Sequence, residues 1–394
     1  MTGITGSDIR SRAASLMAAA TLLVSFAGCA DGSDDAWDGT ITTLPSGARL
    51  VQNPATGVWR SGEAWRVEEE LRIGSSVGDG PDVFSVVFAL DSDDAGNIYA
   101  FDTMSRELRV FGHDGTHLRS YGRQGGGPGE FEAVIGLRVR EAGETWIVDM
   151  QNARYTVLRA DSVAVHPRPA GMYRPPWIGG FTADGVFHDV AAIRDGEVLI
   201  RVAPDGTVQD SVWLPFPDLP QPRRGSITFD LPFGPQHLRA FDPTGAVWTA
   251  TSHEYRLHRV TLAGDTILTV THPQTPRPLA PEARDSVTRY ARMLENEVRL
   301  TVSSDMIPRE APVLQWLAVD DRGYLWVGLA GAEDEPTQAD IYDGDGRYLG
   351  RLVLPFTSMQ ALPPRFRNGR LYTMTEDALG SPVIMRARID GRRD

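Results

Sequence analysis

The 394-residue chain contains no lysine, since all 39 of its basic residues are arginine. This absence excludes any mechanism that needs a lysine Schiff base or a lysine general base. The single cysteine is Cys29, so the chain that follows it has no disulfide, no thiolate nucleophile and no cysteine metal ligand. Acidic residues number 52 and bring the net charge to −13, which disfavours nucleic acid and other polyanions as partners.

Long apolar runs are also lacking. The apolar segment Ala13–Ala27 follows Arg10 and Arg12 and is shorter than the roughly 20 residues of a comfortable membrane span. It ends just before Cys29, in a pattern typical of a lipoprotein cleavage site. We therefore expect residues 1–28 to be a lipoprotein signal peptide and Cys29 to be lipidated. A plain signal peptide cut nearby and a short uncleaved anchor are the alternatives.

Residues 29–45 are rich in glycine, serine and aspartate at their start, and we expect them to form a flexible tether. Ala30 follows the cysteine, where an aspartate would favour retention in an inner membrane. We therefore expect the protein in the cell envelope, lipid-anchored at the outer membrane or facing the periplasm. The remaining residues, 46–394, are long enough to bury a core without disulfides.

The stretch from residue 84 to residue 131 is organised as short segments of alternating apolar and polar residues separated by turn residues. The predicted strands are Phe84–Leu90, Ile98–Phe101, Leu108–Phe111 and Thr116–Tyr121. Four antiparallel strands joined by tight turns make one blade of a β-propeller, which needs neighbouring blades to cover its faces.

The same pattern recurs along the chain. Gly80-Pro81 matches Gly127-Pro128, and Gly96 matches Gly143, both at an offset of 47 residues. Later turn glycines followed by an aromatic strand bring the number of units to six: Gly185, Gly245, Gly323 and Gly369. We predict an all-β fold, a six-bladed propeller of four-stranded antiparallel blades over residues 46–394.

Two further features complete this prediction. The segment Ala64–Gly74 is a lone strand ahead of the first unit, and we expect it to complete the last blade and close the ring, which removes exposed sheet edges. Residues 276–308 form an insertion between the fourth and fifth blades, with apolar residues at helical spacing after Pro281. We expect this helix to lie against a propeller face or the side of a blade, or to be exposed for a partner.

The first two units carry a family resemblance. Asp94-Ala-Gly-Asn-Ile-Tyr99, Leu108-Arg-Val-Phe111 and the run Gly122–Phe131 resemble six-bladed β-propellers related to NHL repeats, which are common among bacterial lipoproteins and secreted proteins. The resemblance covers roughly residues 50–390 and implies the fold. It implies little chemistry, because most members of that bacterial group have no established activity.

Several motifs have a catalytic or a structural interpretation. The glycine-rich run 122–131 lacks the lysine and the following helix of a phosphate loop, so we predict a tight crossing between blades. Asp91–Gly96 and the acidic turn 340–345 lack the ligand pattern of a calcium loop, and we predict plain strand turns. The eight histidines show no zinc-ligand spacing. We expect no metal and no other cofactor.

A ligand site is expected where the innermost strands begin, near the rim of the central channel. The candidate ligand-binding residues are Glu130, Tyr173, Arg174, His237, Arg239, Gln315, Trp316, Arg365 and Arg367. Four arginines among them suit an anionic ligand such as a carboxylate or sugar acid, by bidentate pairing. The alternative is that each arginine pairs with an acidic neighbour across blades.

These observations favour a binding or scaffold module, a lipid-anchored propeller that presents one face to a protein, peptide or carbohydrate partner, and we expect it to be a monomer. The alternative is a metal-dependent hydrolase or lyase resembling gluconolactonase-like propellers, which requires several acidic residues at the axis. A structural envelope protein without a small ligand is the third possibility. No catalytic residue is assigned.

Overall fold

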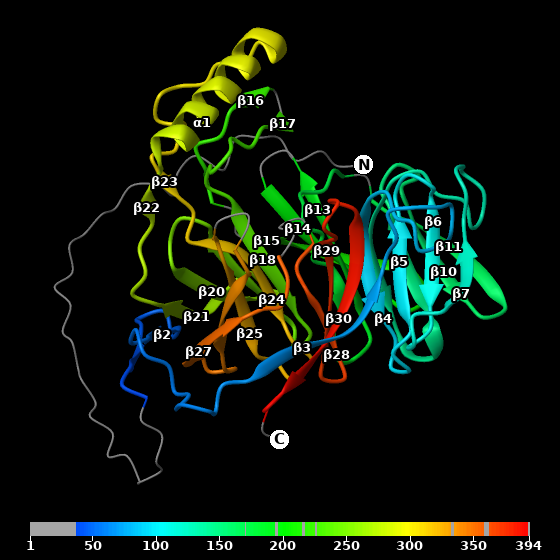
Figure 1. The fold of residues 1–394 in the computed structure, drawn as a ribbon, viewed down its shortest axis with the longest axis horizontal. Coiled ribbons are helices and arrows are strands. Elements are labelled where there is room, and N and C mark those ends of the chain that lie inside the picture. The colour runs from blue at the N-terminus through cyan, green and yellow to red at the C-terminus, as the bar shows by residue number, and fades with distance from the viewer. Residues whose placement is uncertain are drawn as a thin grey trace, which may run out of the picture. The chain divides into compact units, whose positions relative to one another are not determined.

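The computed structural model describes residues 37–169, 171–193, 196–214, 217–224, 227–331, 335–357 and 362–392 (Figure 1). The expected signal peptide and the expected lipidation site, Cys29, lie outside these residues. Within them, no helix is long and apolar enough to cross a membrane.

Six sheets form the body of the fold, as predicted, and in each of them four strands pair antiparallel as one blade. The first blade contains β4 (Val87–Ser92), β5 (Ile98–Asp102), β6 (Glu107–Phe111) and β7 (His117–Tyr121), and the second β8 (Val134–Val139), β9 (Thr145–Asp149), β10 (Arg154–Arg159) and β11 (Ser162–Pro167). The third contains β12 (Gly180–Phe181), β13 (Phe187–Ile193), β14 (Gly196–Val202) and β15 (Val208–Leu214), and the fourth β18 (His237–Asp242), β19 (Ala246–Thr251), β20 (Arg256–Thr261) and β21 (Thr266–Thr271). The fifth contains β24 (Leu314–Val319), β25 (Leu325–Leu329), β26 (Gln338–Tyr342) and β27 (Tyr348–Val353), and the sixth β28 (Arg365–Arg367), β29 (Arg370–Glu376), β30 (Pro382–Asp390) and β3 (Arg66–Ile73).

The N-terminal strand closes the ring. β3 pairs antiparallel with β30 and becomes the outer strand of the sixth blade, which confirms the prediction made for Ala64–Gly74. A cluster of buried apolar side chains between the last and first blades joins Ile73, Ile384 and Leu90. Five further clusters fill the other interfaces between neighbouring blades. Each blade therefore buries both faces against its neighbours, which a single blade cannot do alone.

The segment ahead of β3 differs from the expected tether. β1 (Thr40–Thr43) and β2 (Arg49–Gln52) form a hairpin, and β2 pairs in parallel with β21, so the fourth blade has six strands. Asn53 fixes the end of the hairpin, because its Oδ1 accepts hydrogen bonds from the Tyr348 backbone N–H at 2.7 Å and from Trp37 Nε1 at 3.1 Å. Residues 40–43 of the range 29–45 are therefore held in a hairpin that pairs with β21, the outer strand of the fourth blade.

The glycine-rich run 122–131 is a crossing between the first and second blades, as predicted. Gly122 has φ +105°, and a Cβ there would lie 2.6 Å from a backbone oxygen and 2.7 Å from the Phe131 ring, so only glycine fits. Arg154 of β10 donates hydrogen bonds to the carbonyl oxygens of Gly126 and Gly127 at 2.7 and 2.9 Å. In the first blade Arg109 binds the carbonyls of Pro81 and Val83 in the same manner.

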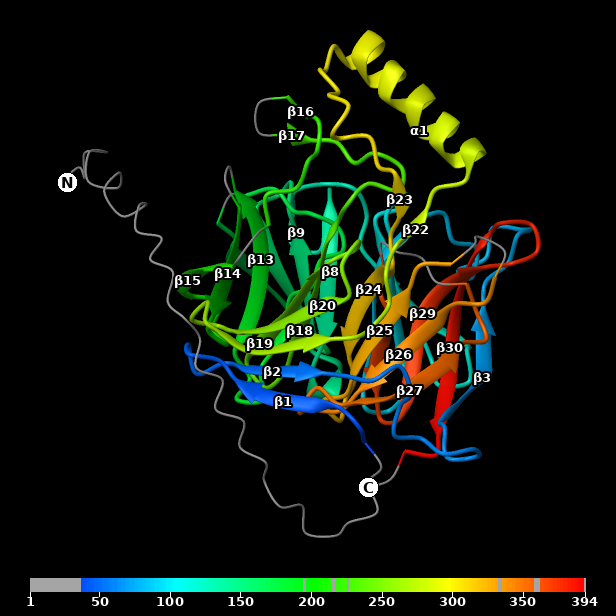
Figure 2. The ribbon, with the colours of Figure 1, turned by 90° about the vertical axis from the view of Figure 1, so that its left-hand side faces the viewer.

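Two insertions stand on one side of the blades (Figure 2). The first, between β15 and β18, contains β16 (Arg223–Arg224) and β17 (Ile227–Thr228); the second lies between β22 (Arg277–Pro278) and β23 (Glu310–Ala311) and contains the predicted helix, α1 (Pro281–Met293), with a π-helical turn Leu294–Val298. The apolar face of α1 packs on the insertions themselves, where Ala291 and Leu294 join Leu231 and Leu300 in one cluster. That cluster contains no blade strand residue, so the expectation that this face lies against a propeller face or the side of a blade is corrected: its cluster partners belong to the insertions.

Candidate functional site

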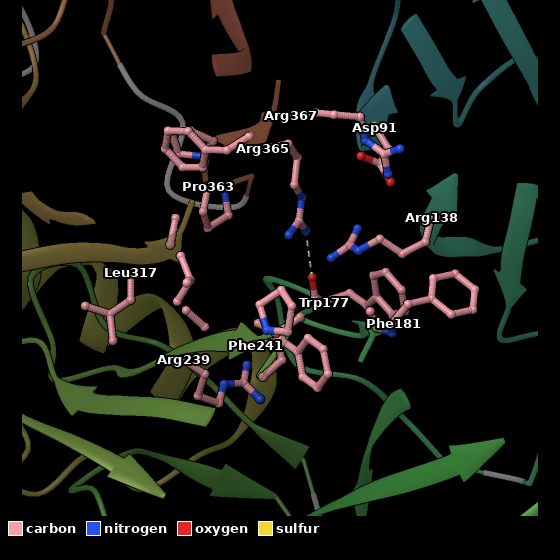
Figure 3. A pocket seen from close by; sticks show the side chains of 18 of the residues that line it. Asp91, Arg138, Trp177, Phe181, Arg239, Phe241, Leu317, Pro363, Arg365 and Arg367 are labelled. Atoms are coloured by element: carbon pink, nitrogen blue, oxygen red, sulfur yellow. Dashed lines mark hydrogen bonds between the residues drawn. The ribbon is translucent and has the colours of Figure 1, made fainter. Parts of the chain in front are cut away.

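The propeller axis holds a cavity of about 180 Å³ lined by residues from all six blades (Figure 3). Its charged lining residues are Asp91 of β4, Arg138 of β8, Arg239 of β18, and Arg365 and Arg367 of β28. One carboxylate therefore faces four guanidinium groups.

Arg138 and Arg365 point toward one another inside this cavity (Figure 3). Arg138 Nη1 donates to the Leu137 carbonyl oxygen at 2.7 Å, and its guanidinium carbon lies 4.7 Å from the centre of the Trp177 ring. Arg365 Nη2 donates to the Trp177 carbonyl oxygen at 3.2 Å. Among the described residues, neither arginine forms a salt bridge. Burial lowers the pKa of both guanidinium groups, and repulsion from Arg365 lowers that of Arg138 further.

The other charged groups of the cavity are already engaged. Asp91 is buried, and its two carboxylate oxygens each accept a backbone N–H at 2.9 Å, from Ser92 and from Val139. Arg367 pairs with the exposed Asp94 at 3.0 Å and donates to the Val139 carbonyl oxygen at 2.7 Å. The site therefore keeps two half-buried cations, Arg138 and Arg365, which form no salt bridge within the described part of the chain, although the charge of Asp91 partly offsets the lowering of their pKa.

A second cavity of about 350 Å³ lies off the axis, where the insertion after β15 meets the loop between β11 and β12. It contains Tyr173, Arg174 and His237, and it shares Arg239 with the axial cavity. His237 is half-buried, and burial together with the charges of Arg239 and Arg174 holds its pKa well below the usual value.

A buried ion pair includes Arg239, the residue that lines both cavities. Arg239 and Glu197 have side chains 2% and 0% exposed, and Arg239 Nη1 contacts Glu197 Oε1 directly. Arg239 Nη2 also donates to the Arg174 carbonyl oxygen at 3.1 Å, and Arg174 Nε lies 4.0 Å from the same Glu197 oxygen. Because Glu197 belongs to the third blade and Arg239 to the fourth, the pair ties two blades together.

Three predicted residues line neither cavity. Glu130 holds the glycine-rich crossing, where it accepts hydrogen bonds from the Gly127 N–H at 2.7 Å and from Arg123 Nε at 2.9 Å. These bonds, the backbone one first, lower the pKa of Glu130. Trp316 is 1% exposed and belongs to the core between the fifth and sixth blades, and Gln315 precedes it on β24. Of the predicted arginines, Arg174, Arg239 and Arg367 pair with acidic residues, and Arg365 has no such pair in the part of the chain that the structure describes.

Arg138 is a site residue that sequence reasoning missed. The signal was present, because the repeat offset of 47 residues places Arg138 at the position that Asp91 occupies in the preceding unit. Both residues stand on innermost strands and line the same cavity. Had the repeat been used to align the inner strands, this position would have been included.

The acidic turns have structural roles. Asp93 accepts hydrogen bonds from the Asn97 backbone and side chain at 2.9 and 2.8 Å, and Asp343 accepts two backbone N–H groups of its own turn. Asp340 is fully buried and accepts hydrogen bonds from Tyr255 at 2.7 Å and Arg351 Nε at 2.7 Å. In the described part of the chain, no group of three or more histidine, cysteine, aspartate or glutamate residues is arranged to hold a metal ion.

The comparisons with known proteins concern the fold. No family model matches the chain, and no match was found among the curated proteins. A member of the DUF4221 family from Bacteroides vulgatus is similar in structure, with a TM-score of 0.50, 10% identity and coverage of 83% of this chain and 99% of that one. Virginiamycin B lyase from Staphylococcus aureus has a TM-score of 0.45 and 11% identity over 82% and 99% of the chains. Regucalcin, a calcium-binding protein from Agrobacterium tumefaciens, has a TM-score of 0.41 and 15% identity over 87% and 97%. The blade order, the strand pairing and the first of these similarities together establish an all-β six-bladed propeller.

Proposed function

We propose that this protein is a binding module whose axial cavity holds an anionic group of its partner, and that the chain is anchored in the cell envelope through Cys29. The observation that carries the proposal is the pair of half-buried arginines, Arg138 and Arg365, which face one another without a salt bridge to any described residue.

Arginine keeps its positive charge at neutral pH, and a buried charge without a counter-ion is unfavourable. A carboxylate placed between Arg138 and Arg365 accepts charge-assisted hydrogen bonds from both and cancels their mutual repulsion. Asp91 attracts both guanidinium groups electrostatically but forms no salt bridge with either among the described residues, and each of its two oxygens already accepts a backbone N–H.

The cavity volume limits what enters. A space of about 180 Å³ holds a small organic acid or the acidic end of a larger partner. The carboxylate of a sugar acid or of a peptide satisfies this limit, in agreement with the carbohydrate or peptide partner expected from the sequence.

Calorimetric titration of the purified protein with succinate and with its uncharged analogue succinamide tests the proposal. Succinate should bind and succinamide should not. Arg138→Gln and Arg365→Gln should each weaken succinate binding about 10- to 150-fold, the value of one hydrogen bond to a charged group. Arg201→Gln is the matched control, because Arg201 is exposed and pairs with Asp210 on the outer part of the third blade. Equal binding of both compounds, or unchanged affinity in both cavity variants, overturns the proposal.

The anchor has a separate test. Cys29→Ser should move the protein from the membrane fraction to the soluble envelope fraction, and mass spectrometry of the wild-type protein should find an acylated N-terminal cysteine. A Cys29→Ser protein that stays with the membranes, or a wild-type protein without the lipid, contradicts the lipoprotein assignment.

A further inference from the structure

The off-axis cavity is built by loops that interrupt the repeat. Its walls come from the loop between β11 and β12 and from the insertion between β15 and β18. Its volume of about 350 Å³ falls within the range of about 300–1,000 Å³ that is usual for small-molecule sites. The apolar part of the lining is supplied by Pro175, Pro176, Leu219 and Leu238 together with the ring of Tyr173.

Polar groups with unused hydrogen-bonding capacity also face this space. Among the described residues, none hydrogen-bonds to the Tyr173 hydroxyl, which both donates and accepts. Gln221 is 8% exposed and donates through Nε2 to Asp230 at 2.7 Å, while its Oε1 accepts no hydrogen bond from the described part of the chain. Thr228 accepts from Arg174 at 2.9 Å and has its own hydroxyl proton to donate.

The charges around the cavity are balanced. Arg174 and Arg239 both lie close to Glu197, and Asp230 adds a second carboxylate at the exposed edge. His237 stays neutral at physiological pH, since burial and the neighbouring cations hold its pKa well below the usual value. A charged ligand therefore gains little net attraction here, in contrast to the axial cavity.

The second insertion supports this wall from behind. Leu231, which follows the lining residue Asp230, is buried with Ala291 and Leu294 of the helical insertion. Arg224 of β16 donates to the Val298 carbonyl oxygen at 3.4 Å. The two insertions thus form one structure, with α1 standing beyond β16 and β17 (Figure 2). The packing of the two insertions on one another therefore positions the wall of a cavity that the six blades alone do not contain.

We infer that this off-axis cavity is a second binding site and that it takes an uncharged, hydroxyl-rich ring, one sugar unit of a neutral oligosaccharide. A sugar ring presents C–H faces that suit the proline, leucine and tyrosine walls. Its hydroxyl groups both donate and accept, which matches the Tyr173 hydroxyl, Gln221 Oε1 and Thr228. The inference stands independently of the anion proposed for the axial cavity, although Arg239 borders both.

The test begins with an array of neutral and acidic oligosaccharides probed with the purified protein. Wild-type protein should retain at least one neutral oligosaccharide, and that compound is then titrated calorimetrically. Tyr173→Phe removes one hydroxyl and keeps the ring, so it should weaken binding about 2- to 12-fold, the value of one neutral hydrogen bond. Gln221→Leu should weaken binding to a similar or greater extent.

Two variants serve as controls. Tyr121→Phe makes the same change on β7, away from the cavity, and should leave binding unchanged. Arg365→Gln should weaken anion binding in the axial cavity and leave neutral sugar binding intact. If Gln221→Leu fails to fold, as thermal unfolding will show, Tyr173→Phe still decides the question. The inference is overturned if the array retains acidic oligosaccharides alone or none at all, or if Arg365→Gln is the only variant that reduces sugar binding. It is also overturned if no sugar binds and a peptide occupies the cavity instead.

Discussion

Glu197→Gln is the substitution whose effect the structure predicts most directly. Glu197 is fully buried and supplies the carboxylate that neutralises Arg239, whose side chain is 2% exposed. The neutral amide would leave the Arg239 cation buried without a counter-ion, and its remaining partners among the described residues would be neutral oxygens, including the carbonyl oxygens of Arg174 and Pro176 at 3.1 and 3.5 Å. It would also leave Arg174 and Arg239 repelling one another without an anion between them.

The expected loss follows from that geometry. Removing one partner of a buried ion pair costs about 3–5 kcal/mol, because the other charge remains buried and uncompensated. Total stabilities of folded proteins are about 5–15 kcal/mol, so the variant should lose a large part of its free energy of unfolding. Urea unfolding followed by tryptophan fluorescence and circular dichroism measures this change.

The matched control is Asp210→Asn. Asp210 pairs with Arg201 on neighbouring strands of the third blade, where the two side chains are 46% and 42% exposed. Such a pair contributes at most about 1 kcal/mol and is screened by salt. The double variant Glu197→Gln with Arg239→Gln should recover part of the loss, since no unpaired charge remains. Equal losses in Glu197→Gln and Asp210→Asn would refute the assignment of Glu197 as the buried counter-ion.

Three other perturbations have defined outcomes. Gly136→Ala would place a Cβ 2.0 Å from the Trp177 ring and should destabilise the fold by about 1–3 kcal/mol. The control Gly344→Ala meets nothing within 4 Å and should change the unfolding free energy by less than about 0.5 kcal/mol. Similar losses for the two variants in urea unfolding would contradict this prediction. Burial lowers the pKa of His272, so the folded state takes up a proton there less readily than the unfolded state. The stability that is present above about pH 6.5 should therefore be lost as the pH falls below that value. His272→Phe should lessen this loss when urea unfolding is repeated across the pH range, and an unchanged pH profile would contradict the prediction. Deleting β3 would expose the edge of β30 and uncover the core between the last and first blades, so the variant should aggregate or unfold at a lower urea concentration. A monomer of wild-type stability would disprove closure of the ring by this strand.

The blade architecture could be read from the sequence because its signals are local. Apolar alternation marks a strand that is buried on one or both faces, and turn residues mark the hairpins, so β5, β6 and β7 fall within one residue of their predicted bounds. The first strand differs: it was predicted to begin at Phe84 and begins at Val87. The reason is a tertiary hydrogen bond, since the backbone N–H and hydroxyl of Ser85 bind the carboxylate of Asp102 at 2.8 and 2.5 Å.

The site was only partly accessible to the same reasoning. Tyr173, Arg174, His237 and Arg239 were expected at the rim of the central channel with the other candidates, whereas the structure gathers them in the off-axis cavity, and of these four Arg239 alone also lines the axial cavity. Which arginines remain without a carboxylate depends on side-chain directions and on partners from other blades. The pairing of Arg239 with Glu197 and of Arg367 with Asp94, and the convergence of Arg138 on Arg365, have no signature in the local sequence.

The sequence by itself determined the number of blades, the closure of the ring by an N-terminal strand and the presence of a helical insertion, because each depends on periodicity, turn chemistry and repeat spacing along the chain. Only the tertiary structure decided that residues 40–43 join the fourth blade, that α1 packs on the neighbouring insertion and that two half-buried arginines face one another at the axis. These features arise from contacts between segments far apart in the chain, and the free energy of such contacts depends on which surfaces folding brings together.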